Sequence, residues 1–140
     1  NQDTTGTAAG LTGSPNITVG TIGCGNVTGG GTISDSKGDV RKIPFSSKFS
    51  AYTLAAADTG KVILTYSGGI TVPSSTMSAG DVITVVNSSG SSQTITQGSG
   101  MTMYNTADAA TGNRTLAARA MVTIWFPSAS TAYISGAGLS

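Results

Sequence analysis

The chain has 140 residues, of which only 9% are charged, and its formal net charge is +1. This length suits one ordinary domain, and the chain lacks the clustered basic groups with which proteins neutralise nucleic-acid phosphates. The absence of histidine removes the usual Ser-His and Cys-His catalytic arrangements and the commonest metal ligand. We therefore expect a protein that is not an enzyme, carries no cofactor or metal and binds no nucleic acid.

The composition favours strands over helices. Glycine accounts for 20 residues, serine and threonine are abundant, and the mean hydropathy is slightly positive. β-branched residues favour strands and Gly-Ser-Asn clusters favour turns, whereas no stretch combines helical periodicity with caps. The sequence predicts an all-β protein in which "LAAAD" (54–58) and "ADAAT" (107–111) form no more than turns.

The N-terminal region is uncharged from Thr4 to Ser34 and contains few large apolar residues. It is too poor in them to close a core unaided and too polar to span a membrane, so we expect no membrane insertion. The single cysteine, Cys24, is expected to be a free buried thiol, with an intermolecular bridge as the alternative. "GCGNVTG" (23–29) lacks the spacing and the following helix of a dinucleotide-binding loop and is interpreted as a turn or linker.

A cluster of charged residues separates this region from a more apolar one. The cluster consists of Asp35, Lys37, Asp39, Arg41, Lys42 and Lys48. We expect an extended attachment or shaft segment at residues 1–45, which finds its burial against another subunit, and a folded domain at residues 46–140. Trypsin is expected to cut near Arg41, Lys42 and Lys48.

The downstream region contains nine strand-like stretches separated by turn sequences such as "DTG", "SGG" and "TGN". Short strands at spacings of roughly 8–12 residues are typical of a sandwich or jelly roll, so the sequence predicts an antiparallel β-sandwich with jelly-roll-like character. The expected strands are 51–55, 61–66, 69–73, 81–87, 92–97, 101–105, 114–117, 120–126 and 131–136.

Alternation along these stretches predicts which side chains face the core. Trp125 falls out of phase with Val122 and Ile124, so it is expected to face a partner chain or a second layer rather than a stacked ligand. The expected inward residues are Tyr52, Leu54, Val62, Leu64, Val72, Val82, Thr84, Val86, Ile95, Met103, Leu116, Val122, Ile124, Phe126 and Ile134.

Few polar residues suggest chemistry. Asp58, Asp81 and Asp108 are candidates for paired carboxylates of a glycosidase, but Asp58 and Asp81 lie in turn-like settings where Asp commonly caps the backbone. We interpret them as structural. Arg114 and Arg119 precede the most apolar strand and are expected to pair with Asp81 or Asp108 at a strand end or a subunit seam, with an anionic sugar as the alternative ligand.

Several stretches resemble a domain found near the C-termini of bacteriophage virion proteins, chiefly tail fibres and related capsid-surface fibre or decoration proteins, typically of cyanophages and other marine phages. The resemblance covers most of residues 1–140, and the upstream "TGTAAGLTGSPNITVGTI" (5–22) is similar to the repetitive shafts before such domains. The segment "IWFPSASTAY" (124–133) is more aromatic than the family pattern. The downstream stretches are "YTLAAADTGKVI" (52–63), "ITVPSSTMSAGDVITVVNSSGSSQTITQGSGMTMY" (70–104), "TGNRTLAARAMVTI" (111–124) and "ISGAGL" (134–139).

The resemblance implies a homotrimeric, β-rich structural protein on the external surface of a virion, without enzyme activity and without site residues to carry over. A tail-fibre role implies attachment to host-surface glycans through loops, whereas a decoration role implies that the N-terminal segment binds other virion proteins. The loops expected for glycan binding are 67–69, 88–92, 98–100, 105–113 and 127–131. The alternative from another class is a cellular pilus or surface-filament subunit, extracellular and assembled by strand exchange. The third class is an enzyme, a capsular depolymerase built on the three Asp residues.

Overall fold

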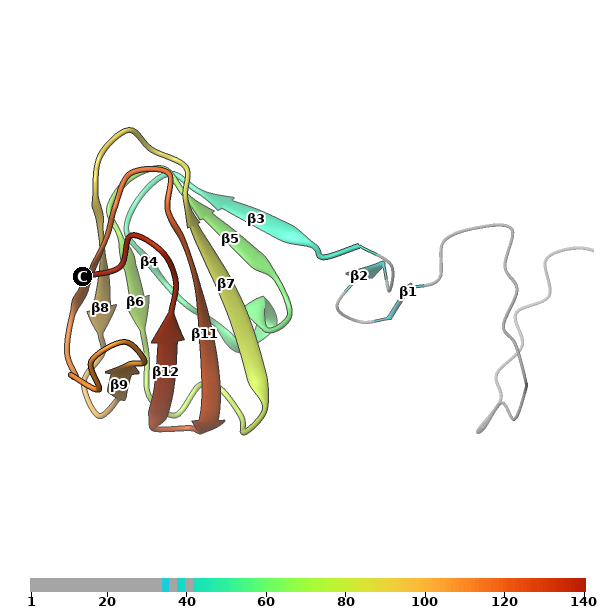
Figure 1. Cartoon of the computed structure of the whole chain (residues 1–140). Helices are drawn as coiled ribbons and strands as arrows, with labels where there is room; N and C mark the ends of the chain where they lie inside the picture. Colours follow the sequence, from blue (N-terminus) through green and yellow to red (C-terminus); the bar gives the residue numbers. More distant parts are fainter. Residues whose placement is uncertain (1–33, 36–37, 40–41) are drawn as a thin grey trace, which may run out of the picture. The chain divides into compact units, whose positions relative to one another are not determined.

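The computed structural model describes residues 34–35, 38–39 and 42–140, and nearly all regular elements within them are β-strands. A six-stranded sheet has the strand order β3-β5-β7-β11-β12-β9, and a four-stranded sheet has the order β10-β8-β6-β4 (Figure 1). The first comprises β3 (Phe45–Lys48), β5 (Val62–Thr65), β7 (Asp81–Asn87), β9 (Thr102–Asn105), β11 (Met121–Ser128) and β12 (Thr131–Ser135). The second comprises β4 (Tyr52–Thr53), β6 (Ile70–Val72), β8 (Gln93–Gln97) and β10 (Arg114–Leu116).

The remaining elements are short. β1 (Ser34–Asp35) and β2 (Gly38–Asp39) pair antiparallel, and η1 (Ala56–Asp58) is a single turn of 3-10 helix. Within the described residues no helix is long and apolar enough to cross a membrane.

The prediction of an all-β protein is confirmed, and each of the nine expected strands coincides with an observed strand, β4 to β12. The strand β3 was not expected. Its sequence, Phe-Ser-Ser-Lys, has a single apolar residue, and Phe45 is itself 69% exposed, so no apolar alternation marks the segment. Most of the predicted attachment segment 1–45, including Cys24 and residues 23–29, lies outside the described residues, and the division at 45/46 stays a prediction.

The expectation of antiparallel pairing throughout is wrong, because both sheets are mixed. From β3 to β8 the chain alternates between the sheets, so neighbours within a sheet come from every second strand. Strands β3, β5 and β7 run parallel to one another, as do β4, β6 and β8, and these six strands wind as a coil. The turn sequences between these six strands cross from one sheet to the other. Within the two sheets, antiparallel strand pairing is limited to β10 with β8, β7 with β11, and β11 with β12.

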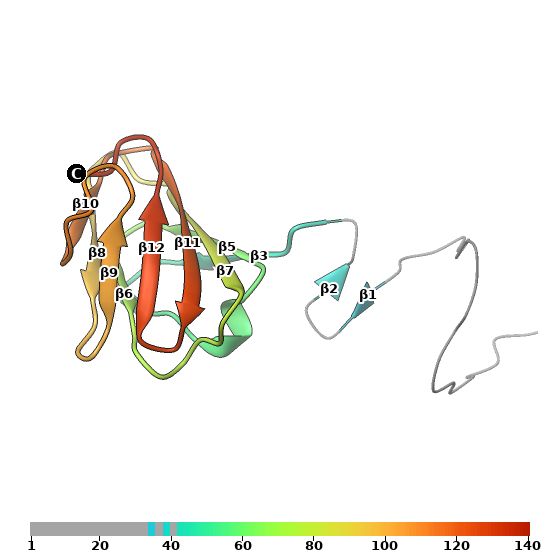
Figure 2. The same ribbon diagram turned by 60° about the horizontal axis from the view of Figure 1, so that its bottom comes forward.

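The two sheets enclose one hydrophobic core (Figure 1, Figure 2). Ile70, Val72, Ile95 and Leu116 contribute from the four-stranded sheet, and each is at most 1% exposed. The other core residues are Leu54, Ile63, Met77, Ile83, Val85, Met101, Met103, Val122, Ile124, Phe126, Ala132 and Ile134. Of the expected inward residues, Leu54, Val72, Ile95, Met103, Leu116, Val122, Ile124, Phe126 and Ile134 are confirmed.

The predicted phase of β5 and β7 is wrong. Ile63 and Thr65 are fully buried, so they are the residues of β5 that face the core. Ile83, Val85 and Asn87 are fully buried in the same way on β7. Both strands carry apolar residues in consecutive positions, so hydropathy alone does not fix which set points inward. The expected inward residues that instead take the outward phase are Val62, Leu64, Val82, Thr84 and Val86.

Candidate functional site

The outer face of the six-stranded sheet is the most unusual surface of the described chain. Because side chains alternate along a strand, its outward positions can be assigned from the buried ones. None of these positions carries a charge. They are Phe45, Ser47, Val62, Leu64, Val82, Thr84, Val86, Thr102, Tyr104, Met121, Thr123, Trp125, Thr131, Tyr133 and Ser135.

The outer face of the four-stranded sheet is entirely different. Its outward positions are occupied by threonines, and Thr94 and Thr115 lie directly opposite each other on β8 and β10. A threonine surface keeps its hydroxyls in water, whereas an apolar surface gains free energy when it is covered. The outer face of the four-stranded sheet therefore suits contact with water, whereas the outer face of the six-stranded sheet suits contact with another apolar surface. The threonines are Thr53, Thr71, Thr94, Thr96 and Thr115.

Most of the exposed large hydrophobic side chains of the described chain lie on the outer face of the six-stranded sheet or directly after its strands. Phe45 is 69% exposed and Met121 is 56% exposed, and both point outward from the six-stranded sheet. Phe49 and Tyr66, which follow β3 and β5, stack on each other with ring centroids 4.8 Å apart. We call the group at the β3 side of the sheet the assembly patch; it consists of Phe45, Phe49, Val62, Leu64, Tyr66, Val86 and Met121.

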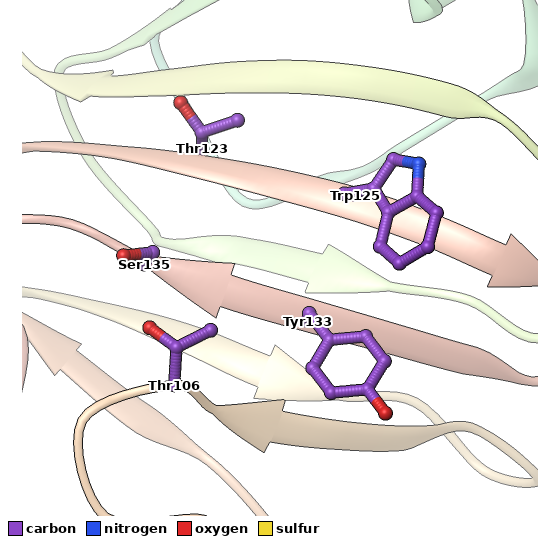
Figure 3. A pocket seen from close by; sticks show the side chains of 5 residues that line it. All are labelled: Thr106, Thr123, Trp125, Tyr133 and Ser135. Atoms are coloured by element: carbon purple, nitrogen blue, oxygen red, sulfur yellow. The ribbon is translucent and has the colours of Figure 1, made fainter.

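At the other side of the same face three aromatic residues form a row across neighbouring strands. Trp125 of β11 lies directly opposite Tyr133 of β12, which lies directly opposite Tyr104 of β9. The ring centroids of Trp125 and Tyr133 are 5.9 Å apart, and those of Tyr133 and Tyr104 are 5.4 Å apart. In Figure 3 the indole and the Tyr133 ring lie side by side with their faces toward the viewer. We call these three residues the aromatic row.

A row of hydroxyl groups runs beside the aromatic row. Thr123 and Ser135 are directly opposite each other on β11 and β12, and the Thr106 backbone N–H donates to the Ile134 carbonyl oxygen at 3.0 Å. With Trp125 and Tyr133 these three residues line an open depression of about 370 Å³ (Figure 3). A second depression of about 380 Å³ adjoins it and is lined by Tyr104, Asn105, Thr106, Ala109 and Tyr133.

The carboxylates of the three candidate Asp residues accept backbone hydrogen bonds within local turns. Asp58 is 4% exposed, and its Oδ2 accepts hydrogen bonds from the Tyr52 hydroxyl and from the Ala55 backbone N–H, both at 2.8 Å. The carboxylate of Asp81 accepts the Ser78 N–H at 2.8 Å, and that of Asp108 accepts the Ala110 N–H at 2.9 Å. Within the described chain no three His, Cys, Asp or Glu side chains form a group suited to a metal ion.

Tyr52 is the one described side chain with a clearly shifted acidity. Its burial raises the pKa of its hydroxyl to about 12, and the hydrogen bond to Asp58 and the negative charge of that carboxylate act in the same direction. The Lys48 Nζ lies 3.6 Å from the centroid of the Tyr52 ring. These contacts tie β3, β4 and η1 together, so we assign the group a structural role.

Within the described chain the two arginines do not pair with Asp81 or Asp108, and a pairing across a subunit seam stays a prediction. Arg114 Nη1 donates to the Asn113 carbonyl oxygen at 3.2 Å, and Arg119 Nη1 donates to the Ser88 carbonyl oxygen at 2.7 Å. Neither contacts Asp81 or Asp108, whose carboxylates serve their own turns. Backbone carbonyls near the strand ends take the place of the expected carboxylates.

Trp125 faces outward as expected from its phase and is 45% exposed. The sequence did not indicate the aromatic row, because Tyr133 reaches Trp125 through the pairing of β11 with β12, and Tyr104 reaches Tyr133 through the pairing of β12 with β9. Their signal was alternation: each tyrosine is flanked by buried residues, Ala132 and Ile134 in one case and Met103 and Asn105 in the other. Comparisons of the chain with protein-family models and with curated proteins find no significant match.

Proposed function

We propose that the chain is a non-enzymatic structural protein on the external surface of a bacteriophage virion, a component of a tail fibre or of a capsid-surface fibre or decoration. In this proposal residues 46–140 form a β-sandwich knob with jelly-roll-like character. The knob assembles as a homotrimer through the assembly patch. Residues 1–45 attach the knob to other virion proteins, and the knob contributes to host attachment.

The observation that carries the proposal is the contrast between the two outer faces. One sheet presents only threonines to solvent, while the other presents an uncharged face with Phe45, Met121 and the stacked Phe49 and Tyr66 exposed. Monomeric proteins rarely leave large contiguous apolar patches uncovered, and such patches mark interaction sites. Depletion of charge at the centre of a patch is also a feature of protein interfaces.

The uncharged surface suits a static component of a particle exposed to salt. Ion pairs at a protein surface contribute little and are screened by salt, whereas apolar contacts and neutral hydrogen bonds are not weakened in this way. The sequence has no histidine and no glutamate, so few side chains titrate between pH 5 and pH 8. The sequence resemblance to virion fibre and decoration proteins points to the same role.

Light scattering on the full chain over a range of protein concentrations tests the assembly step. We expect three times the chain mass, unchanged in about 1 M salt, where the Debye length is only about 3 Å. A monomer at all concentrations would contradict the proposal. Co-purification with empty heads or with isolated tails then separates a decoration protein from a tail fibre.

One observation favours a second candidate, the cellular pilus or surface-filament subunit assembled by strand exchange. β3 is an edge strand of the six-stranded sheet and β4 is an edge strand of the four-stranded sheet. In the described chain no strand pairs with their outer edges. Ile43, just before β3, is 72% exposed. An open edge can accept a strand from a neighbouring subunit. Filaments that lengthen with protein concentration, seen by electron microscopy in place of discrete trimers, would favour this candidate.

A further inference from the structure

We propose that the aromatic row and the hydroxyl row beside it form a binding site for a neutral saccharide. The proposal extends the host-attachment part of the proposed function and names a ligand class and a site. Most of the site lies on the sheet face; of the loops expected from the sequence, only 105–113 contributes, through Asn105, Thr106 and Ala109. It uses side chains separate from the assembly patch, so that the two can be tested independently.

The ring geometry is the first part of the argument. The Trp125 and Tyr133 rings lie side by side (Figure 3), at a tilt of 31° to each other. Tyr104 continues the row by stacking on Tyr133. One face of a pyranose ring presents several C–H groups, which pack well on the electron-rich face of an aromatic ring. Trp125 and Tyr133, with ring centroids 5.9 Å apart, provide a platform for a sugar unit, and Tyr104 supports it by stacking on Tyr133 with ring centroids 5.4 Å apart. Because strand pairing fixes their positions, little side-chain ordering is required on binding.

The hydroxyl groups are the second part. The side-chain oxygens of Thr106, Thr123 and Ser135 border the depression of about 370 Å³, and all three residues are exposed. None of these oxygens has a hydrogen-bond partner among the residues that the structure describes. Each can donate one hydrogen bond and accept others, which matches the hydroxyls of a sugar. Binding sites commonly combine apolar surface with a few such polar groups.

The lack of charged side chains in the site determines which saccharides it favours. Neither depression has an ionisable side chain in its lining other than tyrosine, so nothing there would pair with a sulfate or a carboxylate. An anionic sugar would lose hydration without gaining a cationic partner. The site therefore favours neutral hexose units over uronic acids and sulfated sugars.

A saccharide fits this end of the face better than a second copy of the chain does. Phe49, Phe45 and Met121 of the assembly patch are 72%, 69% and 56% exposed. Trp125 and Tyr133 are less exposed, at 45% and 39%. A protein partner packed against the depression would bury three hydroxyls that have no acceptor or donor opposite them in an apolar contact. Burying such groups unpaired costs about 1–3 kcal/mol each.

Trp125 is the single tryptophan of the chain, so its fluorescence reports directly on the site. The intact assembled protein is titrated with β-1,4-linked hexaoses of glucose, mannose and galactose, and with a sulfated galactan oligosaccharide. We expect at least one neutral hexaose to shift the emission of Trp125 with saturation, and the sulfated sugar to bind at least about tenfold more weakly.

Two variants separate saccharide binding from assembly. Tyr133→Ala keeps Trp125 as the reporter and is expected to weaken binding about tenfold or more while leaving the mass of the assembly unchanged. Leu64→Lys, in the assembly patch, is expected to change the mass but to retain binding of the same hexaose per chain. Thermal unfolding of both variants verifies that each is folded.

Three outcomes would overturn the saccharide site. The first is the absence of a saturable response to all three neutral hexaoses. The second is tighter binding of the sulfated sugar. The third is strong protection of Trp125 from acrylamide quenching in the assembled protein but not in Leu64→Lys, which would mean that a second copy covers the row. A monomeric full-length protein that still binds a neutral hexaose would instead reject the proposed assembly and leave the saccharide site intact.

Discussion

Asn87 at the end of β7 donates a hydrogen bond from Nδ2 to the carbonyl oxygen of Leu116 at the end of β10, at 3.1 Å. The same amide nitrogen also donates to the carbonyl oxygens of Ala117 at 2.9 Å and Ser91 at 2.8 Å. Its Oδ1 accepts the backbone N–H of Ser89 at 3.0 Å. One fully buried side chain thus connects the six-stranded sheet to the four-stranded sheet and to the loop that follows β7.

Replacing Asn87 by leucine should destabilise the fold strongly. Leu has a similar volume but removes the amide donor to the buried Leu116 carbonyl and the acceptor of the Ser89 N–H, and unpaired buried polar groups are costly. The Ala117 and Ser91 carbonyls keep the Ala120 N–H and the Ser89 hydroxyl as donors. We expect Asn87→Leu to lower the free energy of unfolding by about 2–4 kcal/mol in urea denaturation. The control is Asn113→Leu, which removes a single exposed hydrogen bond, from the Gln97 N–H at 2.9 Å, and should cost no more than about 1 kcal/mol. Equal losses for the two variants would contradict the connecting role of Asn87.

The Tyr52 hydroxyl should give stability that disappears in strong alkali. Its pKa is about 12 in the folded chain, against about 10 in an unfolded one, so the folded state holds this proton more tightly. The contribution is then fully present below about pH 10 and is lost as the pH rises toward 12. Urea denaturation at a series of pH values should show Tyr52→Phe less stable than the parent below pH 10, with the difference shrinking above it.

The control for this experiment is Tyr66→Phe. The Tyr66 hydroxyl has no hydrogen-bond partner among the described residues, so its stability difference from the parent should not follow the same pH course. A Tyr52→Phe difference that stays constant from pH 8 to pH 12 would show that the hydrogen bond to Asp58 does not hold the proton.

A charge placed in the assembly patch should dissociate the proposed trimer. Leu64 points outward between Ser47 and Val86 in the sheet, and a buried lysine ammonium there would have no acidic partner. We expect Leu64→Lys to reduce the mass in light scattering to that of one chain. Thr94→Lys, at an exposed position of the four-stranded sheet, is the matched control and should keep the parent mass. A stable trimer of the Leu64→Lys variant would show that the interface does not include the assembly patch.

Limited trypsin digestion should remove the N-terminal segment and spare the folded region. Lys48 lies within β3, where its carbonyl oxygen accepts the Tyr66 N–H at 2.9 Å and its ammonium covers the Tyr52 ring. We therefore expect the first stable fragment, identified by mass spectrometry, to begin after Arg41 or Lys42, and cleavage after Lys48 to be slower. Rapid, uniform cleavage at Lys61, Arg114 and Arg119 would contradict a folded domain at residues 46–140.

Local signals in the sequence predicted the strands well but not their partners. Turn sequences bounded β4 to β12, and alternation placed Val122, Ile124 and Phe126 in the core. The pairing was missed because a short polar loop is compatible with both a hairpin and a crossing to the opposite sheet. The phase of β5 and β7 was missed because consecutive apolar residues satisfy either orientation.

The candidate site was predictable only in part. Trp125 was identified as outward from its phase alone, and the structural role of Asp58 and Asp81 followed from their turn settings. The aromatic row depends on the parallel pairing of β12 with β9, which brings Tyr133 beside Tyr104. No local pattern encodes a contact between strands so far apart along the chain, so the row emerges only from the fold.

The winding of β3 to β8 bears on how such a chain can change in length. Each turn of the coil adds one strand to each sheet, in parallel register with the turn before it. Duplication of one turn in the gene would therefore widen both sheets together while preserving every existing pair, and loss of the first turn would expose an equivalent edge. The architecture permits the two sheets to gain or lose strands stepwise without any change in the antiparallel strands β10, β11 and β12.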